Sequence, residues 1–358
     1  MNRSIIILGA AAAIFSGCCN TEASRDSEAL ALLDRLREAS ANTPMMGHQD
    51  DLMYGHEWRL EDDATEWTQS DVKSVCGKYP MVYGLDLAGI ELGSEYNIDH
   101  NDFEQMRLSA LKHYERGGII TMSWHTNNPL TGGDAWDASS NKVVESVLNG
   151  GEKPELFMEW LGKVADYLEK FRAADGKAAA IIFRAWHEHT GSWFWWGQDL
   201  CSTAQYTALW RLCYNYLNGE RGLRNLVWAY SPAGQLKESF MSRWPGDDIV
   251  DVIGVDVYQY GSNEQYQSDL CTMLERVCEA AREHGKIAAL TEAGYEGLPC
   301  GEWWSSVLMP VLDQFPLSYF LVWRNAYQNE KHFYAPFPGQ KSASDFARPV
   351  EEGRIQVL

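Results

Sequence analysis

The segment 181–197 reads Ile-Ile-Phe-Arg-Ala-Trp-His-Glu-His-Thr-Gly-Ser-Trp-Phe-Trp-Trp-Gly. It begins within an uninterrupted apolar run, which is typical of a strand covered on both faces, and then passes into side chains capable of chemistry. Runs of the same kind recur along the 358 residues, so that eight strands are predicted, over residues 44–48, 81–86, 118–125, 179–188, 226–231, 252–256, 287–292 and 319–323.

The intervals between these runs contain helical patterns. Residues 102–116, 156–173 and 270–284 carry apolar side chains at helical spacing, and residues 29–39 predict a further helix before the first strand. Strands alternating with helices indicate parallel βα units, and eight such units predict an α/β fold, a single (β/α)8 TIM barrel. The alternative, a doubly wound open sheet, lacks support because no glycine-rich phosphate-binding motif follows an early strand.

Polar or aromatic side chains lie at or just beyond the ends of the predicted strands. A barrel gathers these ends around one pocket, which is where barrel enzymes carry their active sites. Each side chain taken singly could be a structural polar group, but their convergence favours a functional site. The residues concerned are His48, Asp86, His125, Glu188, Tyr258, Glu292 and Trp323.

Two glutamates, Glu188 and Glu292, end predicted strands that lie across the barrel from each other. A retaining glycosidase requires such a pair, since one carboxylate attacks the anomeric carbon while the other protonates the leaving oxygen. The acid must hold its proton, and aromatic surroundings and a neighbouring carboxylate both raise its pKa. Because tryptophans flank Glu188, we predict Glu188 as the acid/base and Glu292, in a tight Thr-Glu-Ala-Gly turn, as the nucleophile.

Two other functions compete with this interpretation. His187 and His189 form an HxH pair that a zinc hydrolase could use, together with His125, His48 and Asp86. No CxxC pair occurs, and the sequence does not assign disulfides among the cysteines. A glycan-binding protein without catalysis is the alternative of another class, and it predicts the loss of a catalytic carboxylate, whereas both glutamates are present. For the glycosidase interpretation, we expect neither a metal nor a cofactor.

The segment 184–197 is similar to the pattern R-P-x-H-E-x-x-G-x-W-F-W-W-G of glycoside hydrolase family 26, with Ala185 in place of the proline. The segments 47–51, 123–125, 254–259, 291–294 and 322–325 resemble this family as well, so the resemblance runs from about residue 44 to about residue 330. It implies a (β/α)8 retaining enzyme of a family dominated by β-1,4-mannanases.

The resemblance also implies roles for individual residues. His187 would support the acid/base, Trp193 would form a platform on the leaving-group side, and Tyr258 would orient the nucleophile. His125 and Trp136 would bind sugar on the non-reducing side of the cut, and Trp323 would form the floor of the subsite where the glycosyl-enzyme forms. We also place His48 among the substrate-binding residues.

The expected substrates are mannan, galactomannan or manno-oligosaccharides, with xylan or mixed-linkage β-glucan as alternatives. The sequence leaves open whether the enzyme cuts within chains or releases mannobiose from their ends. We expect a monomer. The net charge of −20 argues against nucleic acid as a partner, since phosphate binding relies on clustered basic side chains.

The first residues differ in kind from the rest. Arg3 precedes an apolar run over residues 5–15, which is too short to span a membrane and fits a signal peptide. The following Phe-Ser-Gly-Cys resembles a bacterial lipobox, so we predict a lipoprotein signal peptide over 1–17, lipidation of Cys18, a tether over 18–28 and the catalytic domain over 29–358. A secretory signal without a lipid is the alternative. The prediction implies export to a bacterial outer membrane, on either face, with membrane contact through the lipid alone.

Overall fold

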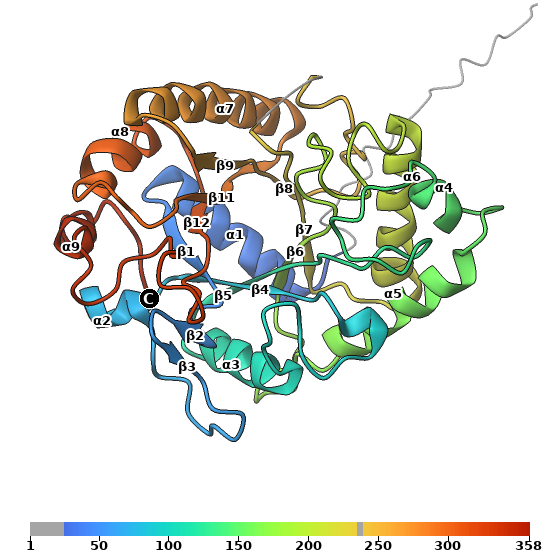
Figure 1. The fold of residues 1–358 in the computed structure, drawn as a ribbon, viewed down its shortest axis with the longest axis horizontal. Coiled ribbons are helices and arrows are strands. Elements are labelled where there is room, and N and C mark those ends of the chain that lie inside the picture. The colour runs from blue at the N-terminus through green and yellow to red at the C-terminus, as the bar shows by residue number, and fades with distance from the viewer. Residues whose placement is uncertain (1–24, 235–238) are drawn as a thin grey trace, which may run out of the picture.

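The computed structural model describes residues 25–234 and 239–358. Its main sheet is parallel, in the order β10-β8-β7-β6-β5-β4-β1-β12-β11-β9 (Figure 1). The strands are β1 (Met45–Gln49), β4 (Val82–Asp86), β5 (Ile119–Ser123), β6 (Ile181–Arg184), β7 (Leu226–Tyr230), β8 (Val252–Ile253), β9 (Asp256–Gln259), β10 (Ile287–Ala288), β11 (Leu290–Tyr295) and β12 (Tyr319–Val322).

The sheet closes on itself into the predicted eight-stranded barrel. The sixth predicted strand is divided into β8 and β9, and the seventh into β10 and β11. β8 pairs with β7 and with β10, while β11 pairs with β9 and with β12. The pairing of β1 with both β4 and β12 completes the ring. The prediction of a (β/α)8 barrel is therefore confirmed.

The helices surround this barrel. They are α1 (Ser27–Ala41), α2 (Asp71–Cys76), α3 (Phe103–Glu115), α4 (Val143–Val147), α5 (Pro154–Leu168), α6 (Thr203–Tyr214), α7 (Asn263–His284), α8 (Met309–Leu312) and α9 (Ala343–Glu351). Three shorter helices are η2 (Ile90–Leu92), η3 (Asn215–Glu220) and η4 (Trp303–Leu308), and a small hairpin pairs β2 (Tyr54–Gly55) with β3 (Trp58–Arg59). The predicted helix over 270–284 begins earlier, because the Ser262 hydroxyl accepts a hydrogen bond from the Gln265 amide and caps α7.

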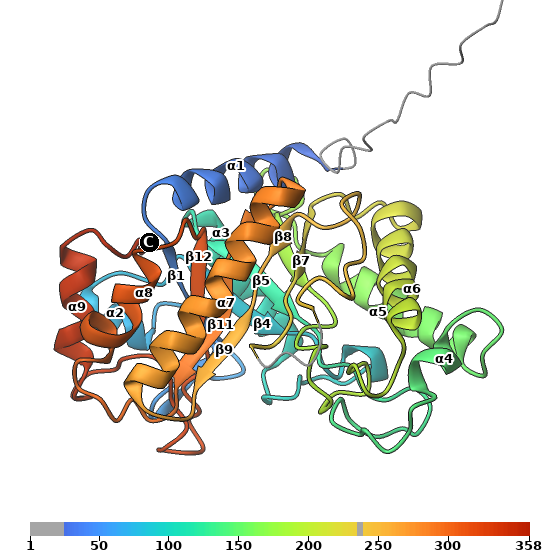
Figure 2. The ribbon, with the colours of Figure 1, turned by 90° about the horizontal axis from the view of Figure 1, so that it is seen from above.

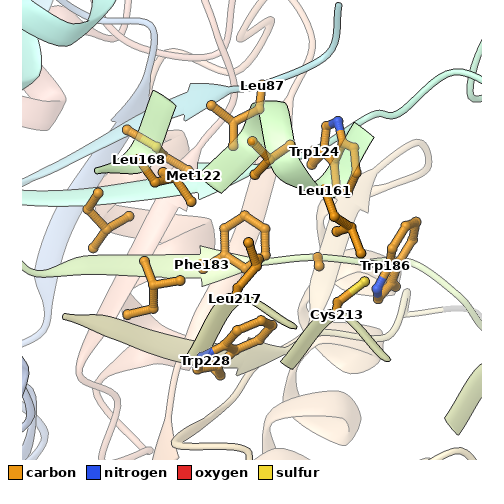
Figure 3. Packing of buried hydrophobic residues seen from close by; sticks show 14 of the residues in the cluster. Leu87, Met122, Trp124, Leu161, Leu168, Phe183, Trp186, Cys213, Leu217 and Trp228 are labelled. Carbon is orange, nitrogen blue, oxygen red and sulfur yellow. The ribbon is translucent and has the colours of Figure 1, made fainter. Parts of the chain in front are cut away.

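The main core lies between the outer face of the sheet and the helices. Phe183 of β6 and Trp228 of β7 contact each other edge to face, with ring centroids 5.1 Å apart. Figure 3 shows these rings packed with Leu161 of α5, Leu217 of η3 and Trp186. This layer explains why the strands read as continuous apolar runs, since their outer side chains meet helices and their inner ones fill the barrel.

α1 closes the end of the barrel at which the strands begin (Figure 2). Its buried side chains pack against the inner residues at the strand starts, such as Met45, Ile119 and Ile182. Arg25 precedes the helix and is buried, where it forms an ion pair with Asp251 at 2.7 Å. Residues 25–28 therefore belong to the folded body, not to the tether that we predicted up to residue 28. Cys18 and the predicted signal peptide lie outside the described residues.

Two further features concern the described part of the chain alone. None of its helices combines the length and the apolar character that a membrane span requires. Its six cysteines, Cys76, Cys201, Cys213, Cys271, Cys278 and Cys300, form no disulfide with one another.

Candidate active site

The active-site candidates project from the inner face of the barrel, at the end opposite α1. Along β6, Ile182 points inward, Phe183 outward and Arg184 inward again, as the alternation of an extended strand requires. The inner positions at this end are polar, and they open into a cleft of about 860 Å³. Among the residues that line the cleft are His125, Trp136, His187, Glu188, Trp193, Asp256, Tyr258, Glu292 and Trp323.

Glu188 lies four residues beyond the end of β6, in a strained turn. Its φ is 52° and that of Trp186 is 56°, values that side chains other than glycine rarely adopt. The turn is fixed by the Glu188 amide, which donates to the Ser231 carbonyl at 2.8 Å, and by the Gly191 amide, which donates to the Glu188 carbonyl at 2.9 Å. Such strain persists only where the surrounding structure enforces it, and it is common at functional sites.

The surroundings of the Glu188 carboxyl group favour its protonated form. Burial raises its pKa to about 7, and the charge of Glu292 contributes in the same direction. The Trp193 indole donates a hydrogen bond to Glu188 Oε2 at 2.8 Å, which orients the carboxyl group. A carboxyl group with a pKa near neutrality can give a proton to a leaving group and later take one from water.

Glu292 lies within β11 and not in the turn that we predicted. The pairing of β11 with β12 shifts register between Leu290 and Ala293. The shift lets two consecutive side chains face inward, since Thr291 donates to Asp256 Oδ1 at 2.6 Å while Glu292 contacts Arg184. The second oxygen of Glu292 accepts a hydrogen bond from the Tyr258 hydroxyl at 2.6 Å. Both oxygens of this carboxylate thus have fixed partners.

Arg184 joins the nucleophile candidate to a second buried carboxylate. Its guanidinium forms ion pairs with Glu292 and, at 2.8 Å, with Asp256 Oδ2. Burial by itself lowers the pKa of Arg184, but the charges of Asp256 and Glu292 outweigh this and raise it. This positive charge lies against one oxygen of Glu292, the carboxylate that would act as the nucleophile.

The distance between the carboxyl groups of the two glutamates distinguishes a retaining from an inverting glycosidase. Carboxylate oxygens of Glu188, Asp256 and Glu292 lie within 4.8 Å of one another. In retaining glycosidases the two catalytic carboxyl groups are about 5–5.5 Å apart, whereas inverting enzymes hold them about 6.5–9.5 Å apart to admit a water molecule. The arrangement fits the retaining class.

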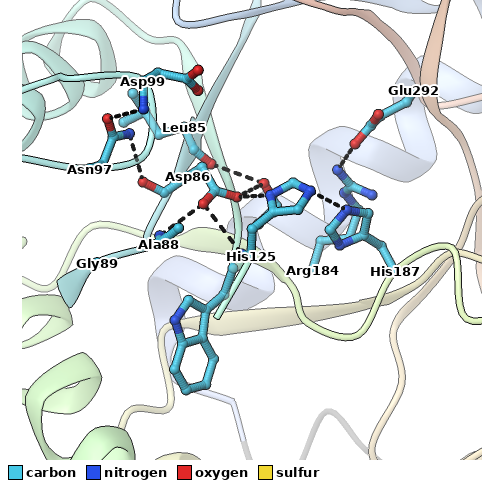
Figure 4. A network of polar contacts seen from close by, with 12 residues as sticks. Leu85, Asp86, Ala88, Gly89, Asn97, Asp99, His125, Arg184, His187 and Glu292 are labelled. Atoms are coloured by element: carbon cyan, nitrogen blue, oxygen red, sulfur yellow. Dashed lines mark hydrogen bonds and ion pairs between the residues drawn. The ribbon is translucent and has the colours of Figure 1, made fainter. Parts of the chain in front are cut away.

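A chain of polar contacts runs from Asp86 through His125 to His187, near Arg184 and Glu292 (Figure 4). His187 Nε2 lies 3.1 Å from His125 Nε2, and His125 Nδ1 lies 2.7 Å from Asp86 Oδ2. Although burial lowers the pKa of His125, the charge of Asp86 outweighs it and raises that pKa. Burial, followed by the charge of Arg184, lowers the pKa of His187. The surroundings therefore favour a positive charge on His125 and the neutral form of His187.

Aromatic rings form one end of the cleft. Trp136 is stacked on His125 with ring centroids 5.2 Å apart, and Trp323 lies 6.4 Å from the same imidazole. Trp193 is partly exposed to the cleft, whereas Trp195 and Trp196 are fully buried and belong to the core. Flat rings around an open space are suited to the C–H faces of a sugar.

His48 does not lie in the cleft, so its prediction as a substrate-binding residue is wrong. On β1, Gly47 faces the interior beside Leu321 and Val82, and the alternation turns His48 toward the helices. The imidazole is fully buried there, with Nδ1 2.7 Å from Asp51 Oδ1. The other side chains predicted to be catalytic or substrate-binding all line the cleft. Asp86, also predicted to lie at this end of the barrel, is buried beneath it in contact with His125.

The residues of the competing zinc site are dispersed. His187 contacts His125 in the cleft, but His189 is buried against Tyr206 and Tyr230, with ring centroids 4.4 and 4.8 Å away. His48 is on the outer face of β1, away from the cleft. In the described part of the chain, the cluster with metal-ligand spacing is Glu188, Asp256 and Glu292, and there the guanidinium of Arg184 already supplies the positive charge.

The sequence did not single out two features of the site. The run over residues 252–256 predicts a strand that ends at Asp256, and Asp256 is not among the predicted site residues, although it ends an apolar run just as Asp86 and Glu292 do. Tyr260 lines the cleft and follows Asp256 and Tyr258 at a spacing of two residues. That spacing is the signal that could have identified it.

Comparisons with known proteins agree with this geometry. The model of glycosyl hydrolase family 26 matches residues 20–335. A mannan endo-1,4-beta-mannosidase of Bifidobacterium adolescentis is 32% identical over 76% of the chain, which spans 27% of that protein. A mannan endo-1,4-beta-mannosidase of Bacillus subtilis is 27% identical over 71% of the chain and 68% of its own length. The structure of a GH26 beta-mannanase from Bacteroides ovatus is 45% identical, covers 93% of this chain and 96% of its own, and superposes with a TM-score of 0.89.

Proposed function

Since the chain belongs to glycosyl hydrolase family 26, we propose that it hydrolyses β-1,4-mannosidic bonds with retention at the anomeric carbon. The observation that carries the proposal is the close pair of carboxylates in the cleft. Glu188 has a pKa raised to about 7, whereas Glu292 accepts from Tyr258 and pairs with Arg184. Two carboxylates with such different surroundings are suited to different roles.

In the first step, Glu292 attacks the anomeric carbon while Glu188 gives its proton to the oxygen of the bond being cut. The bond between that carbon and the leaving oxygen breaks, and the sugar on the leaving-group side departs with a new hydroxyl group. A covalent glycosyl-enzyme remains, with the sugar held as an ester of Glu292. The Trp193 indole keeps the carboxyl group of Glu188 in place during this transfer.

In the second step, Glu188 is ionised and takes a proton from a water molecule. The water oxygen attacks the anomeric carbon, the ester bond breaks, and Glu292 leaves as a carboxylate. Arg184 and Tyr258 stabilise the negative charge that returns to Glu292, because they already contact both of its oxygens. Both residues act by position and charge and exchange no proton.

The proposed substrates are mannan, galactomannan and manno-oligosaccharides. The relatives named above are described as acting on mannan, and the aromatic cleft is suited to a chain of sugars. Product analysis on mannohexaose distinguishes two modes of action, since a spread of lengths indicates cutting within the chain and mannobiose from the outset indicates release from an end.

Rescue by azide tests the catalytic assignment. With an activated aryl β-mannobioside, Glu188→Ala should form a glycosyl azide of retained configuration, because azide attacks the glycosyl-enzyme. Glu292→Ala should form the inverted azide, since azide then replaces the missing nucleophile. Glu279→Gln, on the exposed side of α7, is the matched control and should behave as the native protein. Full activity on mannan in both alanine variants would exclude the proposal.

We further propose that the protein is exported and anchored through a lipid on Cys18. The support is the lipobox-like segment 15–18, together with the position of α1, which begins at the end of the barrel opposite the cleft. An anchor near Arg25 would leave the cleft facing away from the membrane. Labelling with a radioactive fatty acid should mark the native protein and not Cys18→Ala, and equal labelling of both would contradict the anchor.

A further inference from the structure

The inner face of β9 continues past the end of the strand. Asp256 and Tyr258 lie two residues apart on this face, where they contact Arg184 and Glu292. In an extended chain, side chains two residues apart project to the same side, about 6–7 Å from each other. Tyr260 is the next member of this series, and it lines the same cleft nearer to solvent.

The backbone that carries Tyr260 is fixed, while the ring itself is uncovered. Gln259 accepts a hydrogen bond from the Trp303 indole at 2.7 Å and donates one to Asn263 at 2.8 Å, which holds the end of β9. Within residues 25–234 and 239–358, Tyr260 has no hydrogen bond and no ring contact, and it is 85% exposed. A ring mounted in this way is available to pack against a ligand.

Tyr260 lies apart from the aromatic end of the cleft. His125, Trp136 and Trp323 are joined there by ring contacts, and Tyr260 takes part in none of them. It lines the cleft together with Gly234, which follows β7, and with the first turns of α7. In the sheet, β6, which leads to Glu188, lies between β7 and β5, the strand that leads to His125. Glu188 and Glu292 line the same cleft as Tyr260.

We propose that Tyr260 is a specificity-determining residue that forms a platform for a sugar on the leaving-group side of the cut. Together with Trp193, it offers that sugar two aromatic surfaces in one cleft. The inference rests on the proposed function, and it concerns the part of the substrate that departs in the first step. Tyr260 therefore favours substrates whose leaving group is a sugar over substrates whose leaving group is small.

The test compares two substrates that share the same glycosyl part. When mannotetraose is cut in the middle, the leaving group is a disaccharide. When β-mannobiosyl fluoride is cut, the leaving group is a fluoride ion. For Tyr260→Ala, the ratio of kcat/KM on mannotetraose to kcat/KM on the fluoride should fall about fivefold, as the loss of one aromatic contact implies. Tyr260→Phe keeps the ring and should hold the ratio within about twofold of the native value.

Leu92→Ala is the matched control, since Leu92 is 54% exposed and does not line the cleft. Its ratio should equal that of the native protein. An unchanged ratio in Tyr260→Ala would overturn the inference, and so would an equal loss on both substrates, which would place the ring on the other side of the cut. A native protein that cleaves neither substrate would overturn the proposed function itself.

Discussion

The two ends of the barrel share the same strands but differ in their inner side chains. At the end covered by α1, Met45, Val82 and Ile182 pack against Leu33 and Leu36. At the cleft end, the inner positions are polar, among them Asp86, Ser123, Arg184, Asp256 and Glu292. Apolar burial at the α1 end stabilises the fold, and this stabilisation offsets the free-energy cost of burying charged side chains at the cleft end.

The largest effect should come from the cleft end. Glu292→Gln removes the nucleophile, and activity on mannan should fall by about 10⁴-fold or more. The protein should still fold, because Arg184 keeps its ion pair with Asp256. Steady-state kinetics and circular dichroism measure the two properties. A folded Glu292→Gln variant that keeps its activity on mannan would contradict the assignment of the chemistry to the cleft end.

Leu36→Ala should show the opposite behaviour. Leu36 is fully buried between α1 and the strand starts, and its truncation should lower the free energy of unfolding by about 2–5 kcal/mol. Urea unfolding measures the loss, and kcat/KM at 25 °C should stay unchanged because the cleft is at the other end. Leu92→Ala, on the surface, is the control and should cost little stability. A large change in kcat/KM for Leu36→Ala would show that the ends are coupled.

Glu188→Gln should show that the ionised carboxylate of Glu188 lowers the free energy of unfolding at neutral and alkaline pH. The pKa of Glu188 is raised to about 7 in the folded protein, above the usual glutamate value of 4.5, so its stabilising contribution is complete below pH 4.5 and is lost as the pH rises through 7. Relative to the native protein, the variant should therefore gain roughly 3 kcal/mol between pH 4.5 and pH 8. Urea unfolding at several pH values tests this. The exposed Glu279→Gln should show no such gain.

The smallest effect concerns the pH dependence of the reaction. The kcat/KM of the native protein should decline above about pH 7, as Glu188 loses its proton. Trp193→Phe keeps a ring but removes the hydrogen bond to the carboxylate, so it should move this limb upward by about one pH unit. A pH profile of initial rates measures the limb. A limb that stays in place or moves downward would contradict the role given to the indole.

The barrel and both glutamates could be predicted because each leaves a local signal. A strand buried on both faces must be apolar throughout, and the polar residue that ends it marks the cleft end. The same rule failed for His48, because an all-apolar strand does not reveal which alternate positions face inward. Only the closed barrel shows that Gly47 faces the interior and that His48 does not.

The contacts across the barrel could not be predicted for a related reason. Arg184 belongs to β6, while Asp256 and Glu292 belong to β9 and β11, which are not its neighbours in the sheet. Their meeting depends on the curvature of the closed sheet and on the register shift in β11. Neither feature has a signature in the order of residues.

The assignment of Glu292 as the nucleophile is tested most directly by trapping the covalent intermediate. A 2-deoxy-2-fluoro-β-mannosyl fluoride should slow both steps through its fluorine, while its good leaving group still lets the first step proceed. Mass spectrometry of the digested protein should then find the added sugar on the peptide that contains Glu292. An adduct on Glu188, or a protein that turns over mannan but never accumulates an adduct, would contradict the account.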